Sequence, residues 1–134
     1  SMGGAIVLRV LIVDQNIDAA LIYAAINADE AVNLAHFKED GRGVEKISAP
    51  PETLERLSPL EFLDLINAPI SVHHGTADSV VPVEWSTDLC EQLQSLGKPA
   101  DCRLYEDQPH TFQNTGDTRF IASMIDFFEI QLGE

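Results

Sequence analysis

Residues 69–82, PISVHHGTADSVVP, begin with a short apolar run that ends at Gly75. An apolar run of this length, closed by a turn residue, predicts a buried strand. Polar residues follow at once, so Asp78 lies just beyond the expected end of the strand. A buried strand with a polar loop at its carboxyl end is typical of a parallel sheet, in which such loops hold the functional residues.

The sequence after this stretch continues the pattern. Residues 83–98, VEWSTDLCEQLQSLGK, predict a helix that stops at Gly97. Residues 102–106, CRLYE, predict a strand, and the loop DQPHTF places His110 beyond its end. Residues 117–134 predict a closing amphipathic helix. The apolar side chains expected on one side of each helix are Trp85, Leu89, Leu93 and Leu96 in the first and Phe120, Met124, Ile125, Phe128 and Leu132 in the second.

Before the opening stretch, two further segments are apolar. Residues 5–13, AIVLRVLIV, indicate a buried helix or a buried strand, and their length does not decide between them. Residues 17–25, IDAALIYAA, favour a strand. Strand and helix alternate from Ile17 to the end, which predicts a single α/β domain over residues 1–134, with a mostly parallel sheet and helices on both faces.

Residues 27–58 differ in character from the segments around them. They are polar and contain Gly41, Gly43 and the pair Pro50-Pro51, which indicates short helical pieces in an insertion that lies over a site. A short helix is expected to follow from Pro59.

Composition excludes several classes of partner. The chain has 134 residues, with 22 acidic and 8 basic side chains and a formal charge of −14, which disfavours nucleic acids and anionic membranes. The sequence has no apolar run of the roughly 20 residues that span a bilayer and no signal segment, so a cytoplasmic location is expected. No metal-binding spacing is present, and no cofactor is expected.

The two cysteines, Cys90 and Cys102, lack the C-x-x-C spacing of a zinc or redox site. They fall on an expected helix and the strand after it. Buried free thiols are favoured over a disulfide between them.

Three residues form a candidate catalytic set in the chain order Ser1, Asp78, His110. A serine hydroxyl is a poor nucleophile at neutral pH and needs an imidazole to take its proton. His110 would take that proton, and Asp78 would hold the ring in the required tautomer and stabilise the imidazolium.

These residues, with the stretches SMGG, HHGTADSVVPVEWS and PHTF, resemble the α/β-hydrolase family, in the branch of prolyl oligopeptidase and dienelactone hydrolase. SMGG is similar to the second half of the nucleophile elbow, and HHGTADSVVP to the acid loop. The resemblance covers the whole chain but only the C-terminal half of the family's catalytic domain, without its N-terminal strands. It implies a serine hydrolase acting on an ester or peptide through an acyl-enzyme, with the Met2 amide as an oxyanion donor and residues 27–58 as part of a lid.

Several alternatives remain beside this interpretation. Ser1 could be left from tag removal, Asp78 could cap a turn, and His110 could be a surface residue. His73 and His74 are expected to be satisfied core residues, and His36 carries no signal.

Alternatives of other classes concern the whole chain. The stretch RVLIVDQN is similar to the first strand of a response-regulator receiver, but Gln15 stands where a second acid is needed and no lysine follows Lys98. The more serious rival is a catalytically incomplete half-domain that pairs with a second copy through the unpaired edge of the strand in residues 17–25.

Overall fold

The computed structural model describes residues 1–39 and 48–133. Its described strands form one parallel sheet: β1 (Ala20–Tyr23), β2 (Ile70–Gly75) and β3 (Ala100–Tyr105). β2 lies in the centre, with Tyr23 paired to His73 on one side and Tyr105 paired to Gly75 on the other. All three strands therefore end at the same edge of the sheet, and the predicted parallel arrangement is confirmed.

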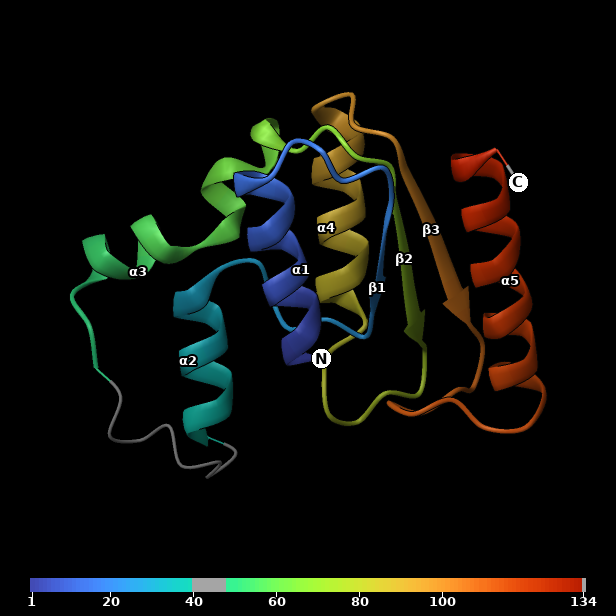
Figure 1. The fold of residues 1–134 in the computed structure, drawn as a ribbon. Helices are drawn as coiled ribbons and strands as arrows, with labels where there is room; N and C mark the ends of the chain where they lie inside the picture. Colours follow the sequence, from blue (N-terminus) through green and yellow to red (C-terminus); the bar gives the residue numbers. More distant parts are fainter. Residues whose placement is uncertain (40–47, 134) are drawn as a thin grey trace.

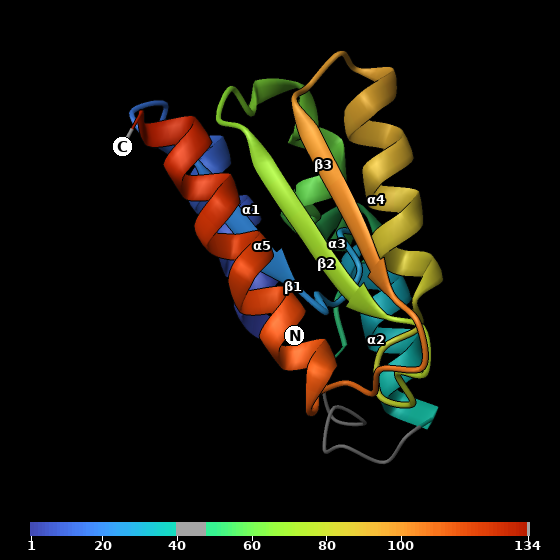
Figure 2. The same ribbon diagram turned by 90° about the vertical axis from the view of Figure 1, so that its right-hand side faces the viewer.

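Helices cover both faces of the sheet (Figure 1 and Figure 2). The helices that flank it are α1 (Met2–Val13) and α4 (Glu84–Ser95) on one face and α5 (Thr115–Leu132) on the other. Residues 5–13 thus belong to a helix, which settles the alternative that their composition left open. The main core lies under α1 and α4 and includes Leu8, Leu11, Ile22, Val72, Leu89 and Leu93.

A close approach fixes α1 against β1. A Cβ atom at Gly4 would lie 3.1 Å from Ala25 Cα and 3.2 Å from Ile22 Cγ2, and closer still to Ala25 Cβ. A Cβ at Gly3 would meet nothing within 4 Å. Of the two glycines in SMGG, only Gly4 is required by packing inside this chain.

The polar excursion is partly helical, as expected. Its described elements are α2 (Glu30–Glu39) and α3 (Pro51–Leu57), followed by the 3₁₀ helix η2 (Pro59–Leu65). The part of the excursion that contains Gly41 and Gly43 lies outside the described residues. Leu60 N donates to Ala28 O at 3.1 Å, and Glu30 N donates to Ser58 Oγ at 2.9 Å, so the two ends of the excursion are joined at its base.

The apolar faces of two helices differ in part from the prediction. In α4, Leu89 and Leu93 are buried as expected, but Leu96 is 47% exposed. In α5, Ser123 and Phe127 are buried, whereas Ile125 and Leu132 face solvent. Apolar residues surround α5 on more than one side, so its sequence alone could not show which side the sheet would cover.

The prediction of free thiols is wrong: Cys90 and Cys102 form a disulfide that joins α4 to β3. Their Cα atoms are 6.3 Å apart, within the range of about 4.4–6.8 Å that a disulfide requires. The helix lies directly on its neighbouring strand, which brings together two positions whose spacing in sequence carries no such signal.

No helix among residues 1–39 and 48–133 is both long and apolar enough to cross a membrane.

Candidate active site

Asp78 and His110 lie in the loops that follow β2 and β3. Because Gly75 and Tyr105 are paired at the ends of these strands, the two loops leave the sheet side by side. His110 Nδ1 lies 2.7 Å from Asp78 Oδ2. Residues 32 positions apart in the chain are therefore joined by a direct hydrogen bond.

Both oxygens of the Asp78 carboxylate accept hydrogen bonds. Its side chain is fully buried, and Oδ1 accepts hydrogen bonds from Val80 N at 2.8 Å and Val81 N at 2.9 Å. Burial raises the pKa of this carboxyl group, but the hydrogen bonds from Val81, His110 and Val80 outweigh that effect, so its pKa lies below the ordinary value. Asp78 is therefore an ionised acceptor at neutral pH.

This ionised partner determines which nitrogen of His110 carries the proton. Asp78 Oδ2 can only accept, so Nδ1 of His110 donates to it. In the neutral ring Nε2 is then unprotonated. The side chain is 24% exposed, and Nε2 has no hydrogen-bond partner within residues 1–39 and 48–133. The geometry leaves a basic nitrogen open at the edge of the sheet.

Backbone contacts hold the Asp78 and His110 loops together. Ala77 N donates to Gln108 O at 3.0 Å, and Asp107 N donates to Thr76 Oγ1 at 2.9 Å. A Cβ at Gly75 would lie 2.7 Å from the carbonyl carbon of Gln108 and closer still to its oxygen. Glycine is needed here because the backbone of one loop crosses directly over the other.

An aromatic cluster that was not predicted from the sequence supports the His110 loop. Phe112 N donates to the Tyr23 hydroxyl oxygen at 2.7 Å, and the rings of Tyr23 and Phe112 lie 4.7 Å apart. Phe120 of α5 packs on both rings. The only sequence signal was the position of Tyr23 near the end of an expected strand.

Ser1 lies at the same edge of the sheet as the two loops. Figure 1 shows the N-terminus near the carboxyl ends of the strands. The Ser1 carbonyl accepts hydrogen bonds from Gly4 N at 3.1 Å and from Ile26 N at 3.3 Å, which anchors it beyond β1. The Ser1 side chain is not bonded to His110 in the described structure, so Asp78 and His110 are brought into contact and Ser1 is not.

Met2, the expected oxyanion donor, is the first residue of α1. The first four N–H groups of a helix have no partner within the helix and point out of its N-terminal end. The Met2 amide is therefore placed where an anion could be bound, next to Ser1.

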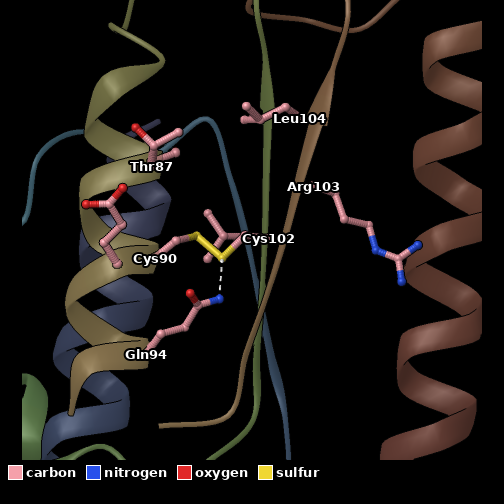
Figure 3. Close-up of a pocket in the computed structure, with 9 residues that line it drawn as sticks. Thr87, Cys90, Gln94, Cys102, Arg103 and Leu104 are labelled. Carbon is pink, nitrogen blue, oxygen red and sulfur yellow. Dashed lines mark hydrogen bonds between the residues drawn. A yellow bond between two sulfur atoms is a disulfide. The ribbon is translucent and has the colours of Figure 1, made fainter. Parts of the chain in front are cut away.

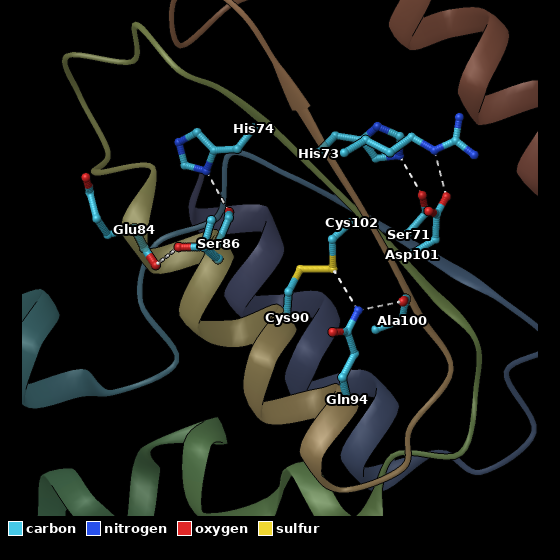
Figure 4. The surroundings of a disulfide bond; sticks show 12 residues. Ser71, His73, His74, Glu84, Ser86, Cys90, Gln94, Ala100, Asp101 and Cys102 are labelled. Atoms are coloured by element: carbon cyan, nitrogen blue, oxygen red, sulfur yellow. Dashed lines mark hydrogen bonds and ion pairs between the residues drawn. A yellow bond between two sulfur atoms is a disulfide. The ribbon is translucent and has the colours of Figure 1, made fainter.

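His73 and His74 are both fully buried, as the sequence analysis expected. Figure 4 shows their rings on opposite sides of β2, with His74 directed toward Ser86 on α4. His73 lies between Ser71 Oγ at 2.7 Å and Tyr105 Oη at 2.9 Å. Burial, with a smaller effect of Arg103, lowers the pKa of His73 to about 4.

The cavity drawn in Figure 3 lies away from these loops. It has a volume of about 230 Å³ and is lined by residues of α4 and β3, including Cys90, Cys102 and Arg103, and by Val72 of β2, but not by Asp78 or His110. The described residues contain no group of three or more His, Cys, Asp or Glu side chains that could hold a metal ion.

A parallel sheet with helices on both faces, and a bonded acid and histidine in successive loops at its carboxyl edge, is the architecture of the α/β-hydrolase class. The comparisons refine this assignment. The model of the prolyl oligopeptidase family matches residues 1–134, and the chain therefore belongs to that family, whose members are serine peptidase-type hydrolases.

Solved structures of peptidases share this fold. An acylaminoacyl peptidase from Pyrococcus horikoshii is 21% identical with a TM-score of 0.82, and the match covers 98% of this chain and 23% of that one. A puromycin-hydrolyzing peptidase from Mycobacterium tuberculosis is 22% identical with a TM-score of 0.81, covering 99% of this chain and 21% of that one. No curated protein sequence matches significantly. The chain thus spans less than a quarter of the length of these structures.

Proposed function

We propose that this chain forms the C-terminal part of a serine hydrolase active site of the peptidase or esterase type. His110 acts as the general base, Asp78 as its orienting acid, and a serine at the position of Ser1 as the nucleophile. The observation that supports this most strongly is the 2.7 Å contact between His110 Nδ1 and Asp78 Oδ2, because it leaves Nε2 of His110 free to take a proton.

The proposed reaction proceeds in two steps. Nε2 of His110 takes the hydroxyl proton as the serine oxygen bonds to the substrate carbonyl carbon, and the same proton passes to the leaving amine or alcohol as the acyl-enzyme forms. Water then attacks the acyl carbon, giving its proton to Nε2, and the serine leaves with that proton. Asp78 stabilises the imidazolium in both steps, and the Met2 amide donates to the oxyanion.

Peptides and small amides are the proposed substrates, with esters as the alternative. The support is that the structurally similar proteins are an acylaminoacyl peptidase and a puromycin-hydrolyzing peptidase. The described parts of the excursion 27–58, residues 27–39 and 48–58, are proposed to form part of a lid over the site. Their helix α2 lies against the segment that follows the Asp78 loop, since the rings of His36 and Trp85 are 4.9 Å apart.

The test is labelling with a fluorophosphonate, which reacts with an activated serine, followed by peptide mapping. We expect label on Ser1 in the wild-type chain and its loss in His110→Ala. The matched control is Glu129→Ala, which changes an exposed side chain on α5 that contacts neither Asp78 nor His110 and should label normally. Label that persists in His110→Ala would refute the proposed base.

A second candidate is a half-domain that pairs with another copy of itself. In the described sheet β1 is paired only with β2, so its other edge is open. Beside that edge lies a cavity of about 320 Å³ lined mainly by apolar side chains, among them Ile6, Val10 and Leu21. Ile6 is 62% exposed and Val10 42%. Unpaired strand edges and contiguous apolar surface both favour association.

Analytical ultracentrifugation separates the two candidates. A dimer that becomes monomeric on Ile6→Glu but not on Val32→Glu, a change on the exposed part of α2, would support pairing through this face. A dimer without fluorophosphonate labelling would favour the half-domain, and a labelled monomer would favour the hydrolase.

The cytoplasmic location stays a prediction, and the disulfide is a reason to test it, because disulfides persist mainly in oxidising compartments.

A further inference from the structure

The Asp78 carboxylate contacts a second histidine that the proposed reaction does not use. His74 Nε2 lies 2.9 Å from Asp78 Oδ2, the same oxygen that accepts from His110. His74 is fully buried on β2, four residues before Asp78. One carboxylate oxygen is thus placed between two imidazole rings.

The surroundings of His74 determine its tautomer. Nε2 faces two groups that can only accept, namely Asp78 Oδ2 and the carbonyl oxygen of Val81 at 3.1 Å, so Nε2 carries the proton. Burial lowers the pKa of His74 despite the nearby Asp78 charge, which keeps the ring neutral. Nδ1 then accepts from the Ser86 hydroxyl at 2.6 Å (Figure 4).

With His74 included, all four acceptor positions of the Asp78 carboxylate are occupied. Oδ1 accepts from Val80 N and Val81 N, and Oδ2 accepts from His110 and His74. A carboxylate bonded in this way cannot rotate without losing several hydrogen bonds to buried groups, each of which is costly to leave unpaired. The direction of the bond to His110 is therefore fixed by the other three donors to the carboxylate, namely Val80 N, Val81 N and His74 Nε2.

We propose that His74 is a positioning residue, which donates from Nε2 to Asp78 so that the carboxylate is held in line with His110 and shares its charge between two imidazole rings. This inference rests on the proposed roles of Asp78 and His110. The Ser86 hydroxyl donates to Nδ1 of His74. This hydrogen bond stabilises the tautomer in which Nε2 of His74 carries the proton.

Two variants at this position separate a hydrogen bond from a packing effect. His74→Gln retains a donor for Asp78 and an acceptor for Ser86 on one side chain, whereas His74→Met fills similar volume without the donor. The matched control is His73→Met, which changes an equally buried histidine at the adjacent position, on the other face of β2 and away from Asp78.

The readout is the NMR titration of the His110 ring. Without the second donor, Asp78 attracts the imidazolium of His110 more strongly, so in His74→Met the midpoint for protonation of His110 should rise by about half a pH unit or more. His74→Gln and His73→Met should keep the wild-type midpoint. An unchanged midpoint in His74→Met, or an equal shift in His73→Met, would overturn the inference.

A second measurement serves if His74→Met does not fold. The ¹⁵N chemical shifts of the wild-type chain should show His74 protonated at Nε2 and unprotonated at Nδ1 from pH 6 to 8. A proton on Nδ1 alone would overturn the inference. Neither measurement requires hydrolysis, so a chain that is not labelled by fluorophosphonate would count against the proposed function and leave these results interpretable.

Discussion

Substitution of Gly75 tests the contact between the Asp78 and His110 loops. Its missing side chain allows the backbone of Gln108 and Pro109 to pass over the end of β2. In Gly75→Ala the new Cβ would lie 2.7 Å from the Gln108 carbonyl carbon and 2.9 Å from Pro109 O, whereas ordinary contacts begin at 3.4 Å. Both groups belong to the backbone, so no side-chain rotation can relieve the overlap.

The size of the effect follows from these distances. The His110 loop must retreat by roughly 1 Å, which stretches the 2.7 Å bond between Asp78 and His110 beyond hydrogen-bond range. A displacement of about 1 Å at a catalytic group can cost about 100-fold in rate. Overpacking of this kind costs about 1–3 kcal/mol of unfolding free energy.

The assay is the rate of fluorophosphonate labelling together with urea unfolding. The control is Gly116→Ala, because a Cβ at Gly116 would meet the flexible side chain of the same Gln108 and not its backbone. We expect a loss of about 100-fold in labelling rate for Gly75→Ala and a much smaller loss for Gly116→Ala. Equal rates for Gly75→Ala and wild type would refute the close approach of the two loops.

Three further predictions concern stability, each measured by urea unfolding. Gly4→Ala should lower the free energy of unfolding by about 1–3 kcal/mol because its Cβ overlaps Ala25. Gly3→Ala should not lower it, because a Cβ there meets nothing within 4 Å. Equal values for the two variants would contradict the packing of α1 on β1. The disulfide closes a loop with a sequence separation of 12, and its reduction should lower the free energy of unfolding by about 3 kcal/mol. A Cys90→Ala/Cys102→Ala variant should not respond to reductant. Two free thiols in the unreduced chain would contradict the pairing. Because the pKa of His73 falls from 6.5 to about 4 on folding, the unfolded chain binds its proton first as pH drops. The free energy of unfolding should therefore be at its maximum above pH 6.5 and fall by up to about 3 kcal/mol toward pH 4. A His73→Gln variant with the same pH dependence would rule out His73 as the cause.

Much of the fold could be predicted because its signals are local. The apolar run that ends at Gly75 predicted β2, and the alternation around it predicted a parallel sheet with helices on both faces. The loops that carry Asp78 and His110 followed from the ends of expected strands. Element bounds were less accurate: β3 begins at Ala100 and α5 at Thr115, both two residues before the expected start.

The candidate site was predicted in part. The residue types and chain order indicated Asp78 and His110, and the structure joins them, whereas the nucleophilic role of Ser1 stays a prediction. His74 was expected to be a satisfied core residue, which its full burial confirms, but its bond to Asp78 had no sequence signal. A buried histidine at a strand end has the same sequence pattern whether its partner is a core serine or a functional carboxylate.

By itself the sequence determined the order of strands and helices from residue 17 onward and which polar residues follow the carboxyl ends of the strands, while it left residues 5–13 open between helix and strand. These properties depend on apolar periodicity and turn residues within short windows of the chain. Only the tertiary structure decided that Cys90 pairs with Cys102, that Tyr23 supports a loop 89 residues away, and that Asp78 lies between two histidines. Such contacts depend on how helices and strands pack across the sheet, at distances of a few ångströms that local patterns do not specify.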